Sequence, residues 1–400
     1  MSLLDFLSEG SAWEKFYTYK TGLVCARDYS EWLRNFIDER KYLPVSAAIE
    51  SGAAFPLPKK AAISKLGKAK KRIVYTYPEN ENTVLKLLTW LMLRQYDALF
   101  APNLYSFRPG RTAKDAVRYM IRSGKASSSW YYKVDISDYF NSIPVERMLP
   151  KLKEVLAEDV RLYEFLARLL SEENVIEHGT VHPETKGIMA GTPISSFLAN
   201  LFLSDLDHAF QEEGKLYLRY SDDILVLGDT EADAKESAEK IRGYLSANGL
   251  RINPEKESFG APEEGISFLG FYILGETVDI APATVTKLKN KMRRKRDALA
   301  RWKARKNVDG SRAAKAFIRI FNRKLLEDSE DHELTWSRWF FPTITTTRSL
   351  HEIDLYAQDC LRFLIGGKHT KARYNVRYED LKELGYLSLV HEYYRHKAAE

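Results

Sequence analysis

Apolar residues recur at helical intervals in the first quarter of the chain. Residues 12–19 and 29–37 carry them every three or four positions, and residues 83–100 have the same spacing with one apolar face. These patterns predict three helices. Residues 55–72 are rich in Pro, Lys and Gly instead, which predicts a flexible basic loop that leads into a strand at 72–77.

The pattern changes in the middle of the chain. Aromatic and β-branched residues at 131–136 predict a strand, and residues 215–229 predict two strands joined by a tight Ser-Asp-Asp turn. Helical spacing is found in four further segments, which are 146–156, 161–170, 196–210 and 234–250. Strand, helix, hairpin, helix and strand is the order of a split βαβ, ferredoxin-like unit.

The last third of the chain combines a predicted hairpin at 265–280 with basic helical sequence from about residue 284. Between Thr284 and Lys306 there are eleven Lys or Arg residues and one acid, Asp297, whereas the net charge of the whole chain is only +6. The remainder of the chain is therefore net acidic. One strongly cationic helix on such a body fits a protein that holds a phosphate backbone.

Length and composition narrow the class of protein. A chain of 400 residues with 44% hydrophobic content can form a sizeable core and two or three domains. Cys25 and Cys360 belong to no CxxC pattern, so we expect no disulfide framework or structural zinc site. The N-terminus lacks the features of a signal peptide, and no apolar run approaches the roughly 20 residues of a membrane span. A cytoplasmic protein without a membrane partner is expected.

Two acidic segments carry the candidate chemistry. Asp135 ends an otherwise apolar strand, and Asp222 and Asp223 lie at a turn between two apolar strands. Three carboxylates in one sheet would repel one another unless a cation were bound. Mg²⁺ takes oxygen ligands, and two ions about 3.5–4 Å apart can serve phosphoryl transfer. Taken singly, the Ser-Asp-Asp segment is more often a polar β-turn, and Asp135 is more often a helix N-cap or a solvent-facing strand end, so the prediction depends on their combination.

Six segments occur in the order found in reverse transcriptases, and the chain resembles that family from about residue 60 to residue 275. The likeness is greatest to the bacterial branch that includes the group II intron and retron enzymes. The segments are SFRPGRTAKDAV, KVDISDYF, GIMAGTPISSFLANLFLSDLD, RYSDDILVLG, GLRINPEKE and SFLGFYI, beginning at residues 106, 133, 187, 219, 249 and 267.

The resemblance implies an α+β fold, the right-hand polymerase. Helices at the N-terminus and the fingers would occupy residues 1–130. A ferredoxin-like palm would occupy 131–275, with a helical insertion at 145–185, and a basic helical thumb with a C-terminal extension would follow at 276–400.

The resemblance also implies the catalytic site. Asp135 and Asp222 would bridge two Mg²⁺ ions, for which Mn²⁺ is a possible substitute, and the Ile136 carbonyl would be a further ligand. Asp223 would lie close by and support the site electrostatically. These three aspartates are the expected catalytic residues of a nucleotidyltransferase.

A second set of residues is expected to contact the incoming nucleotide. Phe140 matches an aromatic ring beneath the sugar that leaves no room for a 2′-hydroxyl, although core packing is the alternative. Arg72 matches an arginine of the fingers that meets the triphosphate, as its rigid fork suits phosphate oxygens, with Lys70 or Lys71 assisting. The complete set is Arg72, Lys71, Asp138, Tyr139, Phe140 and Gly191.

A third set is expected to hold the template and primer. Gly187, Gly191 and Ser195 match the segment that positions the templating base pair. The complete set for template and primer is Arg108, Arg111, Ser195, Lys291, Arg294 and Arg301. Lys256 matches a lysine that protonates the leaving pyrophosphate, but a surface lysine on a turn is the commoner explanation.

Ala190 departs from the intron and retron pattern, which carries glutamine at this position. The ending GYLSLVHEYY and the lack of a VTG signature make the chain most similar to the "unknown group" of defence-associated reverse transcriptases. That kinship implies an RNA-directed DNA polymerase that copies a cognate non-coding RNA in antiphage defence, with dNTPs and an RNA/DNA duplex as partners and an oligomer as a possibility. The alternatives are a template-independent or protein-primed polymerase and a maturase-like RNA-binding protein.

Overall fold

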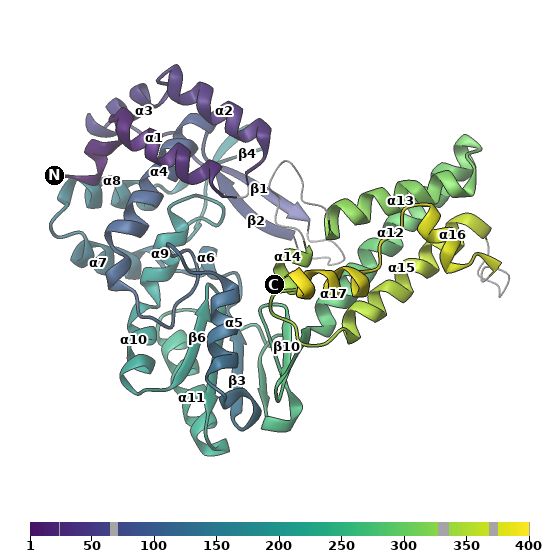
Figure 1. The fold of residues 1–400 in the computed structure, drawn as a ribbon. Coiled ribbons are helices and arrows are strands. Elements are labelled where there is room, and N and C mark those ends of the chain that lie inside the picture. The colour runs from purple at the N-terminus through teal and green to yellow at the C-terminus, as the bar shows by residue number, and fades with distance from the viewer. Residues whose placement is uncertain (24, 65–70, 327–335, 368–374, 400) are drawn as a thin grey trace. The chain divides into compact units, whose positions relative to one another are not determined.

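The chain forms two compact units in the computed structural model, whose ribbon is drawn in Figure 1. The first comprises Met1–Met120 and Ser129–Ala261, and the second comprises Ile121–Ser128 and Pro262–Glu400. The structure describes residues 1–23, 25–64, 71–326, 336–367 and 375–399.

The first unit begins with helices that pack around aromatic side chains. Trp13 is fully buried, and its ring stacks on that of Tyr42 with the centroids 4.9 Å apart. The helices predicted in this region are confirmed, and a further one forms between them. They are α1 (Gly10–Thr21), α2 (Arg27–Asp38), α3 (Tyr42–Glu50) and α4 (Glu79–Gln95).

The prediction of a flexible loop at 55–72 is wrong over part of this range. Lys59–Ser64 forms strand β1, which pairs antiparallel with β2 (Lys71–Thr76). Lysine and alanine have low β-propensity, so the cross-strand hydrogen bonds define this strand and the residue types do not. Lys70 lies outside the described residues.

The insertion predicted to be helical is only partly so. Helices α7 (Val145–Val155) and α8 (Val160–Ser171) are followed by a hairpin of β4 (Asn174–Glu177) and β5 (Thr180–Pro183). Strand β4 pairs with β1, which completes a four-stranded sheet in the order β2-β1-β4-β5. The expectation of a wholly helical segment at 145–185 was therefore wrong.

The predicted split βαβ unit is confirmed. Strands β3 (Trp130–Asp135), β6 (Leu216–Tyr220), β7 (Asp223–Gly228) and β8 (Ser258–Gly260) form an antiparallel sheet in the order β6-β7-β3-β8. This order is that of a ferredoxin-like sheet. The helices that connect its strands include α9 (Ser195–Phe202), α10 (Ser204–Glu212) and α11 (Glu231–Ala247). The single helix expected at 196–210 is thus divided at Leu203.

The second unit combines a small sheet with helices. Strands β9 (Ile266–Phe268), β10 (Phe271–Leu274) and β11 (Thr277–Ile280) pair in the order β11-β10-β9, so the expected hairpin has a third strand. The basic helix is α12 (Pro282–Lys306), in which Val285, Leu288, Met292 and Leu299 are buried. The other helices are α13 (Gly310–Leu325), α14 (Trp336–Phe340), α15 (Arg348–Gly366), α16 (Tyr378–Glu383) and α17 (Leu389–Ala399).

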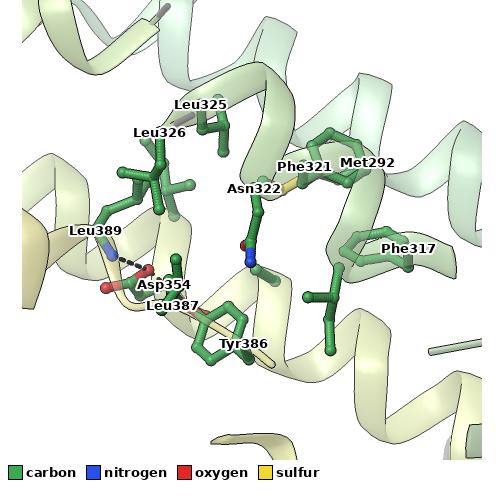
Figure 2. A pocket seen from close by; sticks show the side chains of 13 residues that line it. Met292, Phe317, Phe321, Asn322, Leu325, Leu326, Asp354, Tyr386, Leu387 and Leu389 are labelled. Atoms are coloured by element: carbon green, nitrogen blue, oxygen red, sulfur yellow. Dashed lines mark hydrogen bonds between the residues drawn. The ribbon is translucent and has the colours of Figure 1, made fainter. Parts of the chain in front are cut away.

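A buried carboxylate anchors the C-terminal segment within the second unit. Asp354 of α15 accepts hydrogen bonds from the Ser388 hydroxyl at 2.6 Å, the Tyr386 hydroxyl at 2.8 Å and the Leu389 N–H at 2.9 Å. Figure 2 shows the Asp354–Leu389 hydrogen bond beside a small hollow lined mostly by apolar side chains of α13 and α15. The start of α17 is therefore part of the unit's packed interior.

The division between the units falls before the end of the predicted palm. Strands β9 to β11 lie in the second unit, although the palm was predicted to extend to residue 275. The predicted domain boundaries describe functional parts and stay predictions. Among the described residues, no helix has both the length and the apolar character that crossing a bilayer requires.

Candidate active site

The β6–β7 hairpin brings the three predicted catalytic aspartates to one end of the sheet. Asp222 is in the turn and Asp223 begins β7, where it is the register partner of Asp135 on the neighbouring strand. The Ile136 N–H donates to the Asp222 carbonyl at 3.1 Å. Residues from distant parts of the chain are thus held side by side by one antiparallel ladder.

The turn itself has an uncommon backbone conformation. Ser221 has a φ of 60°, in the left-handed region that L-residues seldom adopt. Its N–H donates to the Ser106 hydroxyl at 2.9 Å, and Ser106 in turn donates to the Asn200 side chain at 3.0 Å. Strained residues of this kind persist only where surrounding contacts hold them, and they cluster at functional sites.

A buried ion pair lies directly behind the turn. The side chains of Arg219 and Asp207 are both fully buried, with the Arg219 Nε 2.8 Å from one carboxylate oxygen and Nη2 2.5 Å from the other. The Arg219 Nη1 also donates to the Ser221 carbonyl at 3.3 Å. This pair was not predicted from the sequence, although an arginine within an apolar strand is an unusual residue that could have indicated it.

Electrostatic repulsion is concentrated on Asp222. Burial raises the pKa of Asp222 to about 6, and the negative charges of Asp135 and Asp223 act in the same direction. Lys256 partly offsets them, because its ammonium group contacts the Asp135 carboxylate. Burial alone would lower the pKa of Lys256, but the hydrogen bond and charge of Asp135 raise it.

The residues fit a divalent cation that is held jointly with substrate. No group of three His, Cys, Asp or Glu side chains in the described part of the chain is arranged as a ready-made metal site. One reason is that Asp135 binds Lys256 and also accepts from the Asn253 amide at 3.3 Å. The donors are nevertheless all oxygen, and Mg²⁺ is commonly held by one or two carboxylates with substrate phosphates. A bound cation would also relieve the repulsion at Asp222.

Tyr139 and Phe140, the two aromatic residues that follow Asp135, lie in different environments. The ring of Phe140 is half-buried and lies edge to face with that of Phe107, with the centroids 6.3 Å apart. Tyr139 is buried, and its hydroxyl donates to the Ala199 carbonyl at 2.6 Å. The expected nucleotide contact of the Tyr139 side chain is therefore corrected to a role in the core. Adjacent residues of a helix point to different sides, so both cannot face the same ligand.

Asn141 connects the palm to the β1–β2 sheet, and the sequence analysis did not identify it. Its side chain donates to the Ile73 carbonyl at 3.2 Å and accepts from the Ala190 N–H at 2.8 Å. The Tyr75 N–H in turn donates to the Ala190 carbonyl at 2.8 Å. Lys71 and Arg72, at the start of β2, remain exposed and available to an anion.

Gly187 and Gly191 are at positions where a side chain would not fit. Both have left-handed φ angles, 53° and 100°. A Cβ at Gly187 would lie 2.5 Å from the Asn141 carbonyl oxygen, and one at Gly191 would lie 3.0 Å from the Tyr75 oxygen. Close packing of backbone against backbone thus explains both glycines.

Two of the residues predicted to bind template have other roles. Arg108 is buried, and all of its N–H groups face Asp97 or the carbonyls of Ala101 and Leu104. It has no donor left for a phosphate. Ser195 is buried and donates to the Thr192 carbonyl at 2.6 Å. Both predictions are corrected to structural roles, because hydrogen bonds within the chain occupy the donors of both side chains.

The other predicted cations remain accessible. Arg111 donates to the Pro102 carbonyl at 2.6 Å and lies over the Tyr105 ring, but its side chain is part of the surface. Lys291, Arg294 and Arg301 are exposed on α12. Burial lowers the pKa of Lys291, and the neighbouring charges of Lys324 and Arg294 lower it further, which indicates a local excess of positive charge.

A ferredoxin-like sheet with three acids at the end of a strained hairpin is the palm of a nucleic-acid polymerase of the right-hand class. Residues 57–273 match the family described as reverse transcriptase (RNA-dependent DNA polymerase), which is more than half of the chain. The chain belongs to this family of RNA-dependent DNA polymerases.

Individual relatives are distant. The chain is 24% identical over 263 residues to Protein YkfC of Escherichia coli, covering 56% of this chain and 68% of that protein. It is 22% identical over 268 residues to an uncharacterized 91 kDa protein in the cob intron of Schizosaccharomyces pombe, covering 52% of this chain and 33% of that protein. Among solved structures, apo telomerase from Candida tropicalis aligns with a TM-score of 0.48 and 12% identity, over 82% of this chain and 69% of that one.

Proposed function

We propose that this chain extends a primer 3′-hydroxyl with dNTPs on an RNA template. The observation that carries the proposal is the set of three aspartates at one end of the palm sheet, where burial and then the charges of Asp135 and Asp223 raise the pKa of Asp222. Asp135 and Asp222 would hold two Mg²⁺ ions, with Asp223 and the Ile136 backbone beside them. When bound, such ions neutralise phosphate charge and activate the attacking hydroxyl, and Mn²⁺ is a possible substitute.

The remaining residues orient the substrate. Phe140 would lie beneath the deoxyribose and exclude a 2′-hydroxyl, while Arg72 and Lys71 would bind the triphosphate. Asp138 and Gly191 would line the same nucleotide site. Asp138 has a left-handed φ of 47°. Lys256 neutralises Asp135 before substrate binds and could then donate a proton to the pyrophosphate.

Primer extension with and without Asp222→Ala tests this proposal. We expect the wild-type chain to extend a DNA primer on RNA in the presence of Mg²⁺, and Asp222→Ala to lose extension. Asp229→Ala is the matched control, because Asp229 is exposed beyond the far end of β7 and should retain activity. Extension by Asp222→Ala at the wild-type rate would contradict the proposed site.

The biological role we propose is antiphage defence with a cognate non-coding RNA as template, acting in the bacterial cytoplasm. It is supported by the kinship inferred from Ala190 and from the C-terminal segment. Sequencing of nucleic acid that copurifies with the wild-type chain and with Asp222→Ala would identify the bound RNA and any DNA product. DNA without an RNA counterpart would favour a template-independent or protein-primed polymerase. Biological activity retained by Asp222→Ala would favour a maturase-like RNA-binding protein.

A further inference from the structure

The first unit has a hollow that is lined by cations and aromatic rings and by none of the three aspartates. It lies where α1 and α4 meet the loop that contains Phe107, and it encloses about 790 Å³ including its open mouth. The lining residues that matter here are Tyr19, Lys20, Lys86, Trp90, Arg94 and Phe107.

Within the described residues, the cations in this hollow have no acid at ion-pair distance. Lys20, Lys86 and Arg94 form no ion pair there, although the charge of Glu79 acts favourably on Lys86 and that of Cys25 on Lys20. The Arg94 guanidinium instead lies 4.2 Å from the Trp90 ring centroid and 4.4 Å from that of Tyr19. Charged side chains that are partly buried are usually paired, so the half-buried Lys20 and Lys86, with the exposed Arg94 beside them on one concave surface, favour a bound anion.

The environment of the lysines supports this interpretation. Burial lowers the pKa of Lys20, and the charges of Lys86 and Arg94 lower it further. Burial likewise lowers the pKa of Lys86. An anion in the hollow would relieve this repulsion and offset the cost of desolvating the two ammonium groups.

Phe107 connects the hollow with the proposed nucleotide site. Its φ is 58°, a conformation that is rare for a bulky residue, and its side chain is 38% exposed although it is fully apolar. The same ring lies edge to face with that of Phe140. Phe107 therefore presents an exposed aromatic ring on the path from Phe140 to the three cations.

We propose that this hollow binds unpaired nucleic acid, with a phosphodiester held by Lys20, Lys86 and Arg94 and a base stacked on Phe107. Cationic grooves with aromatic platforms are the usual means of binding single strands without regard to sequence. The proposal deepens the proposed function and rests on it, because the unpaired strand next to Phe140 would be template that has yet to be copied.

The test compares two duplexes of identical sequence, one blunt and one with a single-stranded 5′ template overhang, bound to the full chain without dNTPs. Fluorescence anisotropy gives the affinity of each at several salt concentrations. We expect Lys20→Gln with Lys86→Gln to weaken binding of the overhang duplex and to reduce its salt slope by roughly 0.7 for each phosphate that is no longer neutralised. Phe107→Ala should weaken the same complex about tenfold, because one base can no longer stack. Binding of the blunt duplex should not change.

Lys15→Gln is the matched control, because Lys15 is exposed on the same helix, α1, and does not line the hollow. Thermal melting of each variant establishes that it is folded. Equal losses of affinity for the blunt and overhang duplexes, or no loss for either, would overturn the proposal. If inorganic phosphate competes equally with the blunt and the overhang duplex, the hollow is a simple anion site. That result would also overturn the proposal. Because binding is measured without DNA synthesis, these outcomes do not bear on the proposed polymerase activity. In the same way, a failure of primer extension does not bear on nucleic-acid binding in the hollow.

Discussion

At the scale of single residues, Asp222 is held in an environment that disfavours its charge. The pKa of Asp222 is raised from 3.8 to about 6, firstly by burial and then by Asp135 and Asp223. A raised pKa in the folded protein means that folding favours the protonated carboxyl. The corresponding stability is present below pH 3.8 and is lost as the pH rises through about 6.

Asp222→Asn should therefore stabilise the metal-free chain at pH 7 by on the order of 1–3 kcal/mol, with little effect at pH 4. Urea unfolding in the presence of a chelator measures this difference, and Asp229→Asn is the control for removal of one exposed carboxylate. Added Mg²⁺ should stabilise the wild-type chain more than Asp222→Asn. Equal stability of the two proteins at pH 7 would contradict the raised pKa of Asp222.

Phe140 determines the choice of sugar if its ring lies beneath the incoming nucleotide. We expect Phe140→Ala to incorporate ribonucleotides markedly better than the wild-type chain, because removal of the ring makes room for a 2′-hydroxyl. Single-nucleotide primer extension with dNTP and NTP gives the ratio of kcat/KM values. The control is Phe259→Ala, a half-buried aromatic residue on β8 that packs against Trp130. Unchanged discrimination in Phe140→Ala would leave Phe140 with a packing role only.

At the scale of secondary-structure elements, the β6–β7 hairpin depends on groups that come from other parts of the chain. The Arg219–Asp207 pair joins β6 to α10, and Arg219 also binds the Ser221 carbonyl. Asp207→Asn would leave a buried guanidinium without its counter-charge, which costs about 3–5 kcal/mol. We expect urea unfolding to show a destabilisation of this size, accompanied by a failure of primer extension.

Asp205→Asn is the control for Asp207, because Asp205 lies on the same helix but pairs with Lys151 at the surface. Exposed ion pairs contribute about 0–1 kcal/mol, so this variant should remain close to the wild-type chain. A comparable destabilisation in both variants would mean that the helix, and not the buried pair, is sensitive to substitution.

The 187–191 segment is held against α6 (Tyr139–Ser142) by a close contact of backbones. Gly187→Ala should displace this segment and lower primer extension strongly, since the new Cβ would lie 2.5 Å from the Asn141 carbonyl oxygen. Gly179→Ala is the matched control. Gly179 also has a left-handed φ, 85°, but a Cβ at this position would have no atom within 4 Å. The control should be destabilised by only about 1 kcal/mol through backbone strain, with normal extension. If the Gly187→Ala variant extends the primer as well as the wild-type chain does, the 187–191 segment has no positioning role.

At the scale of the whole molecule, positive charge is concentrated on α12 while the rest of the chain is net acidic. If α12 holds a duplex, replacing Lys291, Arg294 and Arg301 together with Gln should reduce the salt slope of duplex binding by about 0.9 for each phosphate that these side chains neutralise. The control is Lys289→Gln on the same helix, since Lys289 already pairs with Glu352 at 2.6 Å. A slope that is unchanged in the triple variant would exclude these residues from the duplex interface.

The sequence by itself determined the order of the palm elements, the position of the β6–β7 hairpin and the basic character of α12. These features are local: alternation of apolar residues defines β3 and β7, helical spacing defines α4 and α12, and the acids stand out because they interrupt apolar strands. A pattern that repeats within a few residues needs no knowledge of distant partners.

Only the tertiary structure decided which polar residues serve the site and which serve the fold. Lys256 and Asp135 are separated by 121 residues, and Asn141 and Ala190 by 49, yet they are in contact. Arg108 was predicted to bind template because it lies in a motif, but its neighbours take every one of its donors. A charged side chain acquires its role from the partners that folding brings within hydrogen-bonding distance, and the residue type alone does not specify those partners.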